Sequence, residues 1–411
     1  MINFTWCTIV LAVLVGHFGL NLAVYNRVNA YGWPRRLIKR ITKVFFAFTV
    51  LFPIAMLIFY HDLLGDLMLG RPDELPIPIL MQAYASVCLA SWPVLGIPWL
   101  LYRPIFGPII GPMFNALFGR TLGFDWLVTD RRIEVVQVEQ LLGHSLSLSR
   151  KCRWQARLPL NQIFDLAIEE VTLLVTGLPE ELDGYRIAQL SDIHLTGDIH
   201  GDFSRYAVER ATGWPPDLIA LTGDIIDKSS CINWLGDIFG RASAPDGCYY
   251  VLGNHDTRVT DSVQTRKAMD QAGWTDLGSR GLHRQLRGLP CLLIGNEHPW
   301  YRRPNINPIC EESFRLLVSH SPDQFHWARE HQVHLMLAGH THGGQGRLPL
   351  LGPLLSPSLH GSRYASGDFY RAPTTMHVSR GFSGTHLMRI NCRPELSLLT
   401  LRSPRPADAN T

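Results

Sequence analysis

The sequence predicts an α/β domain preceded by an all-helical membrane module. The first quarter of the 411-residue chain is far more apolar than the rest and contains runs long enough to cross a bilayer. From Tyr185 onward, short apolar runs alternate with polar loops and with segments of helical length, which is typical of α/β folds. The length allows both parts, because it exceeds that of one ordinary compact domain.

Composition and charge exclude several classes of protein. The formal net charge of +3 is small, so no nucleic-acid partner is expected from charge. The eight cysteines include no CxxC pair, which argues against both a zinc ribbon and a disulfide scaffold. Scattered cysteines that can all stay reduced favour a cytosolic setting.

Three apolar runs are candidate transmembrane helices, at residues 4–24, 44–60 and 77–102. The first run is expected to be a retained anchor rather than a signal peptide, because residues 1–3 carry no basic side chain. The run 106–119 is short and is broken by Pro108 and Pro112. It therefore fits a re-entrant or interfacial segment better than a fourth span.

The distribution of Lys and Arg predicts the orientation in the inner, cytoplasmic membrane. The loop after the first run is basic, whereas the loop after the second carries four acidic residues and only Arg71 as a basic one. With three spans, the basic loops and everything after Tyr102 face the cytoplasm. A fourth span at 106–119 would instead place the α/β domain outside.

Changes in composition predict the domain limits. We expect a membrane module over residues 1–120, a linker over 121–160, the α/β domain over 161–403 and a tail over 404–411. In residues 163–176, apolar and polar side chains alternate enough to predict a strand at the start of the α/β domain, here called the entry strand. The basic residues of the linker suit an anionic membrane surface, although a solvated face is the commoner explanation of such a scatter. These residues are Arg131, Arg132, Arg150, Lys151 and Arg153.

Five short apolar runs of the α/β domain are each followed at once by a polar loop. The runs are expected to be buried strands and cover residues 186–190, 218–221, 249–252, 316–318 and 335–338. Segments 203–211 and 265–272 are expected to be helices. Because ligands gather at the carboxyl ends of strands in such sheets, the polar residues should converge. They are Asp192, His194, Asp224, Asn254, His255, Asp256, His320, His340 and His342.

These residue types predict a site for divalent metal ions. Carboxylate, imidazole and amide oxygen together suit Mn, Fe or Zn, and the motifs contain no thiolate of the kind that structural zinc sites use. Asp224 is well placed to bridge two ions, since a carboxylate has two oxygens. Two ions roughly 3.5–4 Å apart can polarise a phosphoryl group and lower the pKa of a bridging water. Each residue alone has an ordinary explanation, such as a turn or a helix cap, so the prediction depends on their joint occurrence in this order.

The polar loops resemble the signature of the calcineurin-like metallophosphoesterases over about residues 163–401. The resemblance is carried by Asp192-x-His194, Gly223-Asp224, Gly253-Asn254-His255-Asp256, His320 and Gly339-His340-Thr341-His342. The continuation Gly343-Gly344-Gln345, with Arg380-Gly381 and residues 393–396, is similar to the membrane-associated bacterial phosphodiesterase branch of that family. More distant relatives include the enzyme that hydrolyses UDP-2,3-diacylglucosamine.

The resemblance implies a four-layer αββα sandwich that holds two divalent metal ions. It implies a first ion held by Asp192, His194, Asp224 and His342, and a second held by Asp224, Asn254, His320 and His340. It implies that His255 is catalytic, donating a proton to the leaving oxygen or stabilising phosphoryl charge. Asp256 would then either orient His255 or serve as a turn carboxylate.

The sequence thus predicts a membrane-anchored hydrolase that cleaves a phosphodiester or pyrophosphate bond by a metal-bound hydroxide. An anchor favours a lipid-linked or sugar-nucleotide lipid substrate, with membrane lipids as further partners. An anchored cyclic-nucleotide or general phosphodiesterase is an alternative within the enzyme class. A membrane sensor or scaffold that binds a phosphoester without turnover is an alternative outside it, which a lost ligand would favour. Every ligand position matches the family pattern.

Weaker candidates for substrate contact lie on the later loops. Arg258 follows the Asn-His-Asp motif closely, and Arg side chains bind phosphate oxygens through two hydrogen bonds. Trp300 and Tyr301 would suit a base or an acyl chain. An ordinary surface or core role is the commoner one for all of these residues, and for Arg347, Arg363 and Arg380.

Overall fold

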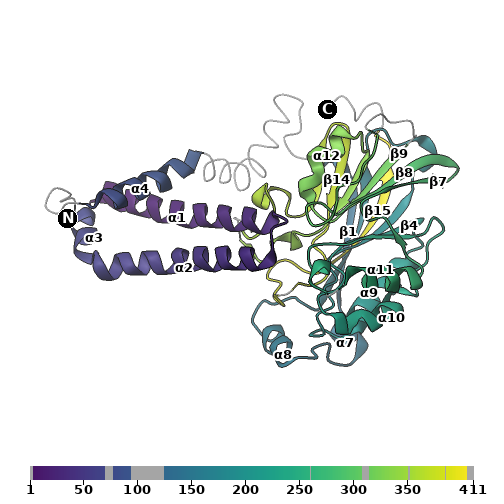
Figure 1. The fold of residues 1–411 in the computed structure, drawn as a ribbon, viewed down its shortest axis with the longest axis horizontal. Coiled ribbons are helices and arrows are strands. Elements are labelled where there is room, and N and C mark those ends of the chain that lie inside the picture. Colours follow the sequence, from purple (N-terminus) through teal and green to yellow (C-terminus); the bar gives the residue numbers. More distant parts are fainter. Residues whose placement is uncertain are drawn as a thin grey trace. The chain divides into compact units, whose positions relative to one another are not determined.

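The computed structural model describes residues 3–69, 77–93, 125–259, 261–307, 314–349, 352–384 and 386–404. The chain divides into two compact units, Met1–Met113 and Phe114–Thr411, and each is described by itself. Figure 1 shows the helical first unit in purple and blue and the sheet-containing second unit in teal to yellow.

The first unit consists, in its described residues, of four helices: α1 (Phe4–Ala30), α2 (Arg35–Phe59), α3 (His61–Met68) and α4 (Ile79–Ser91). Of these, α1 and α2 are long and apolar enough to cross a membrane, and they contain the first two predicted spans. Of the third predicted span, residues 77–102, the structure shows only the shorter helix α4, because residues 94–102 lie outside the described residues. The predicted re-entrant or interfacial segment 106–119 also lies outside them.

Small and polar residues join α1 to its neighbours in this unit. A Cβ at Gly16 would overlap the backbone oxygen of Cys88, so glycine allows α1 and α4 to approach closely. Beside it, the buried His17 contacts the Tyr84 hydroxyl at 2.6 Å through Nδ1. His17 is therefore a packing group between helices.

The second unit contains two large mixed sheets. In the described residues the first has seven strands in the order β1 (Val128–Gln137), β2 (Asp165–Leu174), β15 (Glu395–Arg402), β3 (Arg186–Leu190), β4 (Leu218–Thr222), β5 (Cys248–Val251) and β6 (Thr275–Asp276). The second has six strands in the order β13 (Gly367–Arg371), β14 (Thr374–Val378), β10 (Leu335–Ala338), β9 (Phe314–Ser319), β8 (Leu289–Asn296) and β7 (Gly281–Leu286). A small ribbon pairs β11 (Arg347–Leu348) with β12 (Gly352–Pro353).

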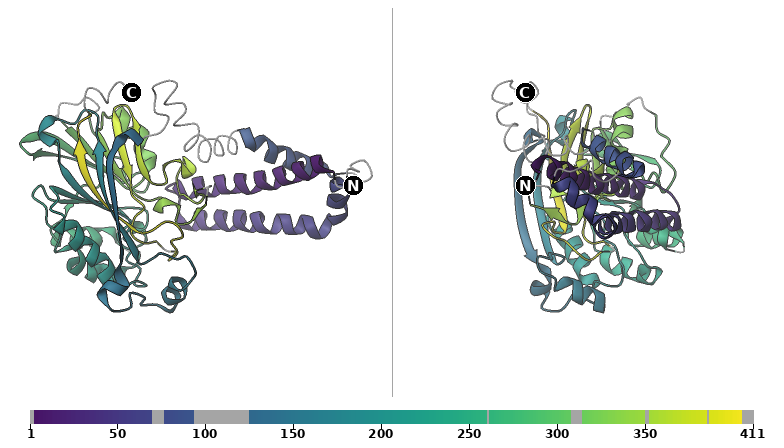
Figure 2. Two further views of the ribbon diagram at one scale, coloured as in Figure 1. Left: turned by 180° about the vertical axis from the view of Figure 1, so that it is seen from behind. Right: turned by 90° about the vertical axis from the view of Figure 1, so that its left-hand side faces the viewer.

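Three apolar cores show how these elements are layered. One core lies between the two sheets, because it combines side chains of β3, β4 and β5 with those of β8, β9 and β10. A second packs the seven-stranded sheet against α9 (Gly201–Gly213), α10 (Leu235–Phe239) and α11 (Ser262–Gln271). A third packs the six-stranded sheet against α12 (Phe325–Glu330). The predicted four-layer αββα sandwich is therefore confirmed, and Figure 2 shows the layers from two further directions.

The five predicted strands and two predicted helices are present, with ends that shift by up to three residues. The predicted entry strand is β2. The stretch predicted as a linker is folded where it is described: it contains β1, α7 (Val138–Leu142) and α8 (Arg150–Ala156). β1 was missed because it is an edge strand with mostly exposed side chains, and its only strand partner is β2 among the described residues. The domain limits themselves stay predictions.

Candidate metal centre

The polar loops meet at one edge of the sandwich because their strands run in the same direction within each sheet. β3, β4 and β5 are parallel neighbours in the first sheet, and β9 and β10 are parallel neighbours in the second. The loops that follow these five strands carry the predicted ligands. Both sheets thus deliver side chains to a single buried site.

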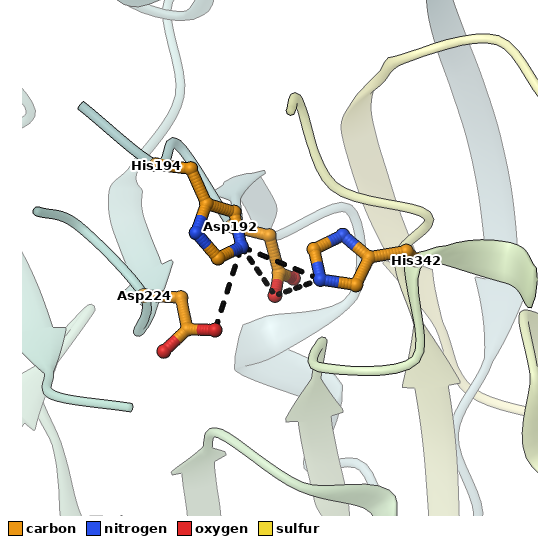
Figure 3. A group of neighbouring side chains, drawn as sticks. All are labelled: Asp192, His194, Asp224 and His342. Carbon is orange, nitrogen blue, oxygen red and sulfur yellow. Dashed lines mark hydrogen bonds and ion pairs between the residues drawn. The ribbon is translucent and has the colours of Figure 1, made fainter. Parts of the chain in front are cut away.

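A first cluster contains Asp192, His194, Asp224 and His342 (Figure 3). His194 Nε2 lies 3.3 Å from His342 Nε2 and 3.4 Å from Asp224 Oδ2. Asp192 Oδ1 lies 3.7 Å from His342 Nε2 and 3.9 Å from His194 Nε2. These four ligand atoms surround one point, as the ligands of a single cation do.

A second cluster contains Asp224, Asn254, His320 and His340. His320 Nε2 lies 3.1 Å from Asn254 Oδ1 and 3.4 Å from Asp224 Oδ1. Its other ring nitrogen, Nδ1, lies 2.7 Å from the carbonyl oxygen of Thr222, and this contact fixes the orientation of the ring. His340 completes the group from the loop after β10.

Asp224 belongs to both clusters through different oxygens. Oδ2 faces His194 in the first cluster, whereas Oδ1 faces His320 in the second. Oδ1 also accepts a hydrogen bond of 2.7 Å from the backbone N–H of His255, which holds the carboxylate in place. Asp224 is therefore oriented as a bridging ligand would be.

The backbone at these positions is strained. Asp192, His194, Asp224, His340 and His342 all have φ between 51° and 69°, a left-handed conformation that side chains other than glycine rarely adopt. Such strain costs on the order of 1–3 kcal/mol per residue and gathers at functional sites. The backbone of Gly253 packs directly against two ligands, since a Cβ there would overlap Asp224 Oδ1 and lie 2.6 Å from His320 Nε2.

The site fits divalent metal ions in its donors and in its charge. Asp224 Oδ2 and His340 Nε2 are buried without a hydrogen-bond partner in the part of the chain that the structure describes. Burial, reinforced by neighbouring histidines, lowers the pKa of His340 and of His342, so both rings are neutral, the form that binds metal. Burial opposes protonation of His320 as well, yet Asp224 raises the pKa of that ring to about 9. The pocket thus attracts positive charge, which metal ions would supply.

Asp227 was missed by reasoning from the sequence, although it links His194 of the first cluster to His255. Its Oδ2 lies 2.8 Å from His194 Nδ1, and its Oδ1 accepts hydrogen bonds from His255 Nδ1 and, at 3.0 Å, from Arg258. The signal was present in Gly223-Asp224-Ile225-Ile226-Asp227, where a second Asp follows in the same strand-end loop.

His255 and Asp256 have separate roles in the structure. Burial lowers the pKa of His255 to about 4, although the carboxylates of Asp224 and Asp227 oppose this. Asp256 does not orient His255: its carboxylate accepts backbone hydrogen bonds of 2.7 Å from Gly253, 3.0 Å from Ile225 and 2.9 Å from Ile226. Of the two roles left open for Asp256, the structure therefore supports the turn carboxylate.

The weaker candidates divide into two groups. The Trp300 ring lies 4.8 Å from that of His340 and 5.2 Å from that of His320, measured between centroids, so this half-buried indole lies beside the second cluster. Arg258 is held at the site by Asp227. Arg380 instead binds Glu169 and Glu395 within the domain, and Arg347 donates to the carbonyl oxygen of Gly343. The structure thus places Trp300 and Arg258 at the rim of the site.

This combination of fold and site agrees with comparison to known proteins. Residues 185–344 match the model of the calcineurin-like phosphoesterase family. The chain is 31% identical to the uncharacterized metallophosphoesterase YkuE of Bacillus subtilis, over 57% of this chain and 85% of that protein. The chain belongs to the calcineurin-like phosphoesterase family, and it is a metal-dependent phosphoesterase.

Two further relatives have more specific names. The phosphodiesterase YaeI of Escherichia coli is 28% identical over 53% of this chain and 82% of its own length. The UDP-2,3-diacylglucosamine pyrophosphatase LpxG of Chlamydia muridarum is 24% identical over 56% of this chain and 88% of its own length. The family and the enzyme class predicted from the sequence are therefore confirmed. Members of the family use a dinuclear metal site.

Proposed function

We propose that this chain is a membrane-anchored, dinuclear metal phosphoesterase that hydrolyses a phosphodiester or pyrophosphate bond. The observation that carries the proposal is the orientation of Asp224, whose two oxygens face two separate groups of ligands. We assign Asp192, His194, Asp224 and His342 to a first divalent ion, and Asp224, Asn254, His320 and His340 to a second. Bound there, two such ions would act as Lewis acids on the phosphoryl oxygens and lower the pKa of a water between them.

The residues of the chain itself provide positioning and proton transfer. Asp227 engages Nδ1 of His255 and so leaves Nε2 to face the substrate. His255 is neutral when the site is empty, because burial lowers its pKa. The negative charge of a bound phosphoryl group favours the protonated ring, which donates its Nε2 proton to the leaving oxygen. Arg258, held by Asp227, adds positive charge beside the same ring.

The substrate class we propose is a lipid-linked or sugar-nucleotide lipid phosphoester. Two observations support it: α1 and α2 are long and apolar enough for an anchor, and one relative is named for a diacylated sugar nucleotide. We further propose that the enzymatic domain, residues 161–403, faces the cytoplasm from the inner membrane, since the basic residues at the end of α1 and in the first turns of α2 predict that side. A reporter fused to the C-terminus tests the orientation, and activity of a periplasmic reporter there would contradict it.

Turnover of bis-p-nitrophenyl phosphate by the full-length protein in detergent with added Mn²⁺ tests the activity. We expect hydrolysis by the wild type, loss of hydrolysis and of bound metal in Asp224→Asn, and loss of hydrolysis with metal retained in His255→Ala. Substrate class is tested next, with a panel of nucleotide-lipid, phospholipid and soluble phosphodiesters. A wild type that retains two metals but cleaves none of these compounds would contradict the proposal and indicate a binding module.

A further inference from the structure

The chain segment that contains α8 carries four cations and no acidic residue of its own. Between Gln140 and Phe164 the sequence contains Arg150, Lys151, Arg153 and Arg157 and neither Asp nor Glu. All four cations are exposed. Three acids lie nearby: Glu139 accepts a hydrogen bond from the backbone of Leu146, Asp202 pairs with Arg205 and His144, and the half-buried Asp198 is bonded through its backbone to Leu148. The four exposed cations outnumber these three acids, so the surface has an excess of positive charge.

The same region exposes large apolar side chains. Trp154 is 65% exposed and Leu160 is 74% exposed, and both Leu141 and Leu148 are also exposed. Single exposed leucines are ordinary on protein surfaces, but four large apolar residues within twenty positions, interleaved with cations, are not. Tryptophan and leucine beside Lys and Arg are typical of segments that lie in the interface of a membrane.

A second exposed apolar segment begins beside the end of the first, at the β11–β12 ribbon. Leu348, Leu355 and Leu359, on and after the β11–β12 ribbon, are exposed. Ile390 joins the two segments, because it forms one backbone bridge with Asn161 and another with Gly346. Asn161 also donates a side-chain hydrogen bond of 2.9 Å to the carbonyl oxygen of Leu387. The two segments therefore flank one strip of chain, residues 386–390.

That strip is bonded directly to the loop of the metal centre. Arg389 donates a hydrogen bond of 3.1 Å to the carbonyl oxygen of His342, and the backbone N–H of Ile390 donates one of 2.9 Å to Gln345. The buried Arg389 also binds the carbonyl oxygens of Arg380 and Ser383. The exposed apolar surface thus borders the loop that carries a candidate metal ligand.

We propose that the exposed side chains of residues 141–160, together with Leu348, Leu355 and Leu359, form a membrane-interface surface that binds anionic lipid beside the metal centre. The charge of the surface favours anionic headgroups, and its Trp and Leu side chains suit the boundary between headgroups and acyl chains. A soluble acidic partner would use the cations but leave the apolar residues exposed. The surface goes beyond the proposed function, because its lipid binding does not require turnover.

The test is hydrogen exchange of the full-length protein in nanodiscs made of phosphatidylcholine alone or of phosphatidylcholine with phosphatidylglycerol. We expect slower exchange of the amides of residues 141–160 in the anionic discs. The variant R150E/K151E/R153E should lose this difference, since each basic residue near an anionic surface strengthens binding about fivefold. The matched control V263S/K267E changes an exposed apolar residue and an exposed cation on α11, and it should keep the wild-type difference.

The experiment distinguishes a loss of lipid binding from a loss of hydrolytic activity. Hydrolysis of soluble bis-p-nitrophenyl phosphate should be unchanged in R150E/K151E/R153E, so that loss of lipid contact is not mistaken for loss of the site. Exchange in residues 141–160 that is the same in both kinds of disc would overturn the proposal. Protection that depends on protein concentration and not on lipid charge would also overturn it, by indicating contact with a second copy of the chain.

Discussion

Two largely buried groups of acidic and basic side chains lie in the same domain, and they differ in how far their members satisfy one another. The metal centre contains carboxylates and imidazoles that point toward a common space. The other group, which we call the charge ring, joins the two sheets and consists of Arg131, Glu169, Arg380, Glu395, His377 and Asp368.

In the charge ring each member contacts the next. Arg131 lies 2.7 Å from Glu169 and 2.5 Å from Asp368, and Asp368 lies 2.7 Å from His377 Nδ1. His377 Nε2 lies 3.7 Å from Glu395, which lies 3.0 Å from Arg380, and Arg380 returns to Glu169. With His377 protonated, three positive charges match three negative ones.

The comparison shows how a structural cluster is distinguished from a functional one. In the charge ring burial opposes protonation of His377, but Asp368 and Glu395 raise its pKa to about 9, so the proton balances the charges. His377 Nε2 makes no hydrogen bond either, but it lies 3.7 Å from the Glu395 carboxylate, whereas His340 Nε2 in the metal centre has, among the described residues, neither a hydrogen-bond partner nor a carboxylate within ion-pair distance. Buried polar atoms without partners cost free energy, so they persist where a bound group completes them.

The largest effect is expected from Gly253→Ala, which fills the space between ligands. The added Cβ would collide with Asp224 and with His320, so the second cluster cannot keep its geometry. We expect a loss of at least about a hundredfold in kcat/KM, since a bound metal contributes several kcal/mol to catalysis. The control is Gly346→Ala, where a Cβ meets nothing within 4 Å among the described residues. Wild-type turnover and metal content in Gly253→Ala would show that the glycine is not required.

His377→Gln tests the charge ring through the free energy of unfolding. Removing one member of a buried ionic group costs about 3–5 kcal/mol. The pKa of His377 is raised from 6.5 to about 9, so its contribution is fully present below pH 6.5 and is lost as the pH rises through 9. Denaturation in detergent from pH 6 to pH 10 should show this loss, on the order of 3 kcal/mol, in the wild type and not in the variant. If the free energy of unfolding changed with pH in the same way in both proteins, the assigned role of His377 would be contradicted.

Asp227→Asn tests a positioning residue of the metal centre. Loss of a carboxylate that orients a ligating or catalytic histidine costs about 10–100-fold in activity or metal affinity. Without this anion the protonated form of His255 is less stable, so the alkaline limb of the pH–rate profile should move to lower pH. An Asp227→Glu variant should restore part of the activity. A fall in kcat with an unshifted pH profile would indicate a structural role only.

Arg131→Met should have the smallest effect, because the Arg131 side chain is 33% exposed. Water screens its two ion pairs, so we expect a loss of about 1 kcal/mol in the free energy of unfolding. Hydrolysis of bis-p-nitrophenyl phosphate should not change. A loss as large as that of His377→Gln would show that the exposed side of the charge ring is as important as its buried side.

The sequence predicted the strands and the polar loops well because both are local signals. Apolar runs such as 335–338 predict buried strands, and the loop after each run carries its ligands in a fixed position. Asp227 stands in the same strand-end loop as Asp224, but its role escaped prediction because its contacts with His194 and His255 form only when three separate loops pack together. The charge ring was missed as well, since its members are spread from Arg131 to Glu395 and meet only when the two sheets pack. β1 lacked the apolar alternation of a half-buried strand.

The number and coupling of bound metal ions test the central claim most directly. The full-length protein loaded with Mn²⁺ should bind two ions per chain, and its electron paramagnetic resonance spectrum should show magnetic coupling between them through the shared carboxylate of Asp224. Asp224→Asn should lose at least one ion and the coupling. Two uncoupled ions in the wild type, or coupling that survives in Asp224→Asn, would contradict a centre built around this bridging residue.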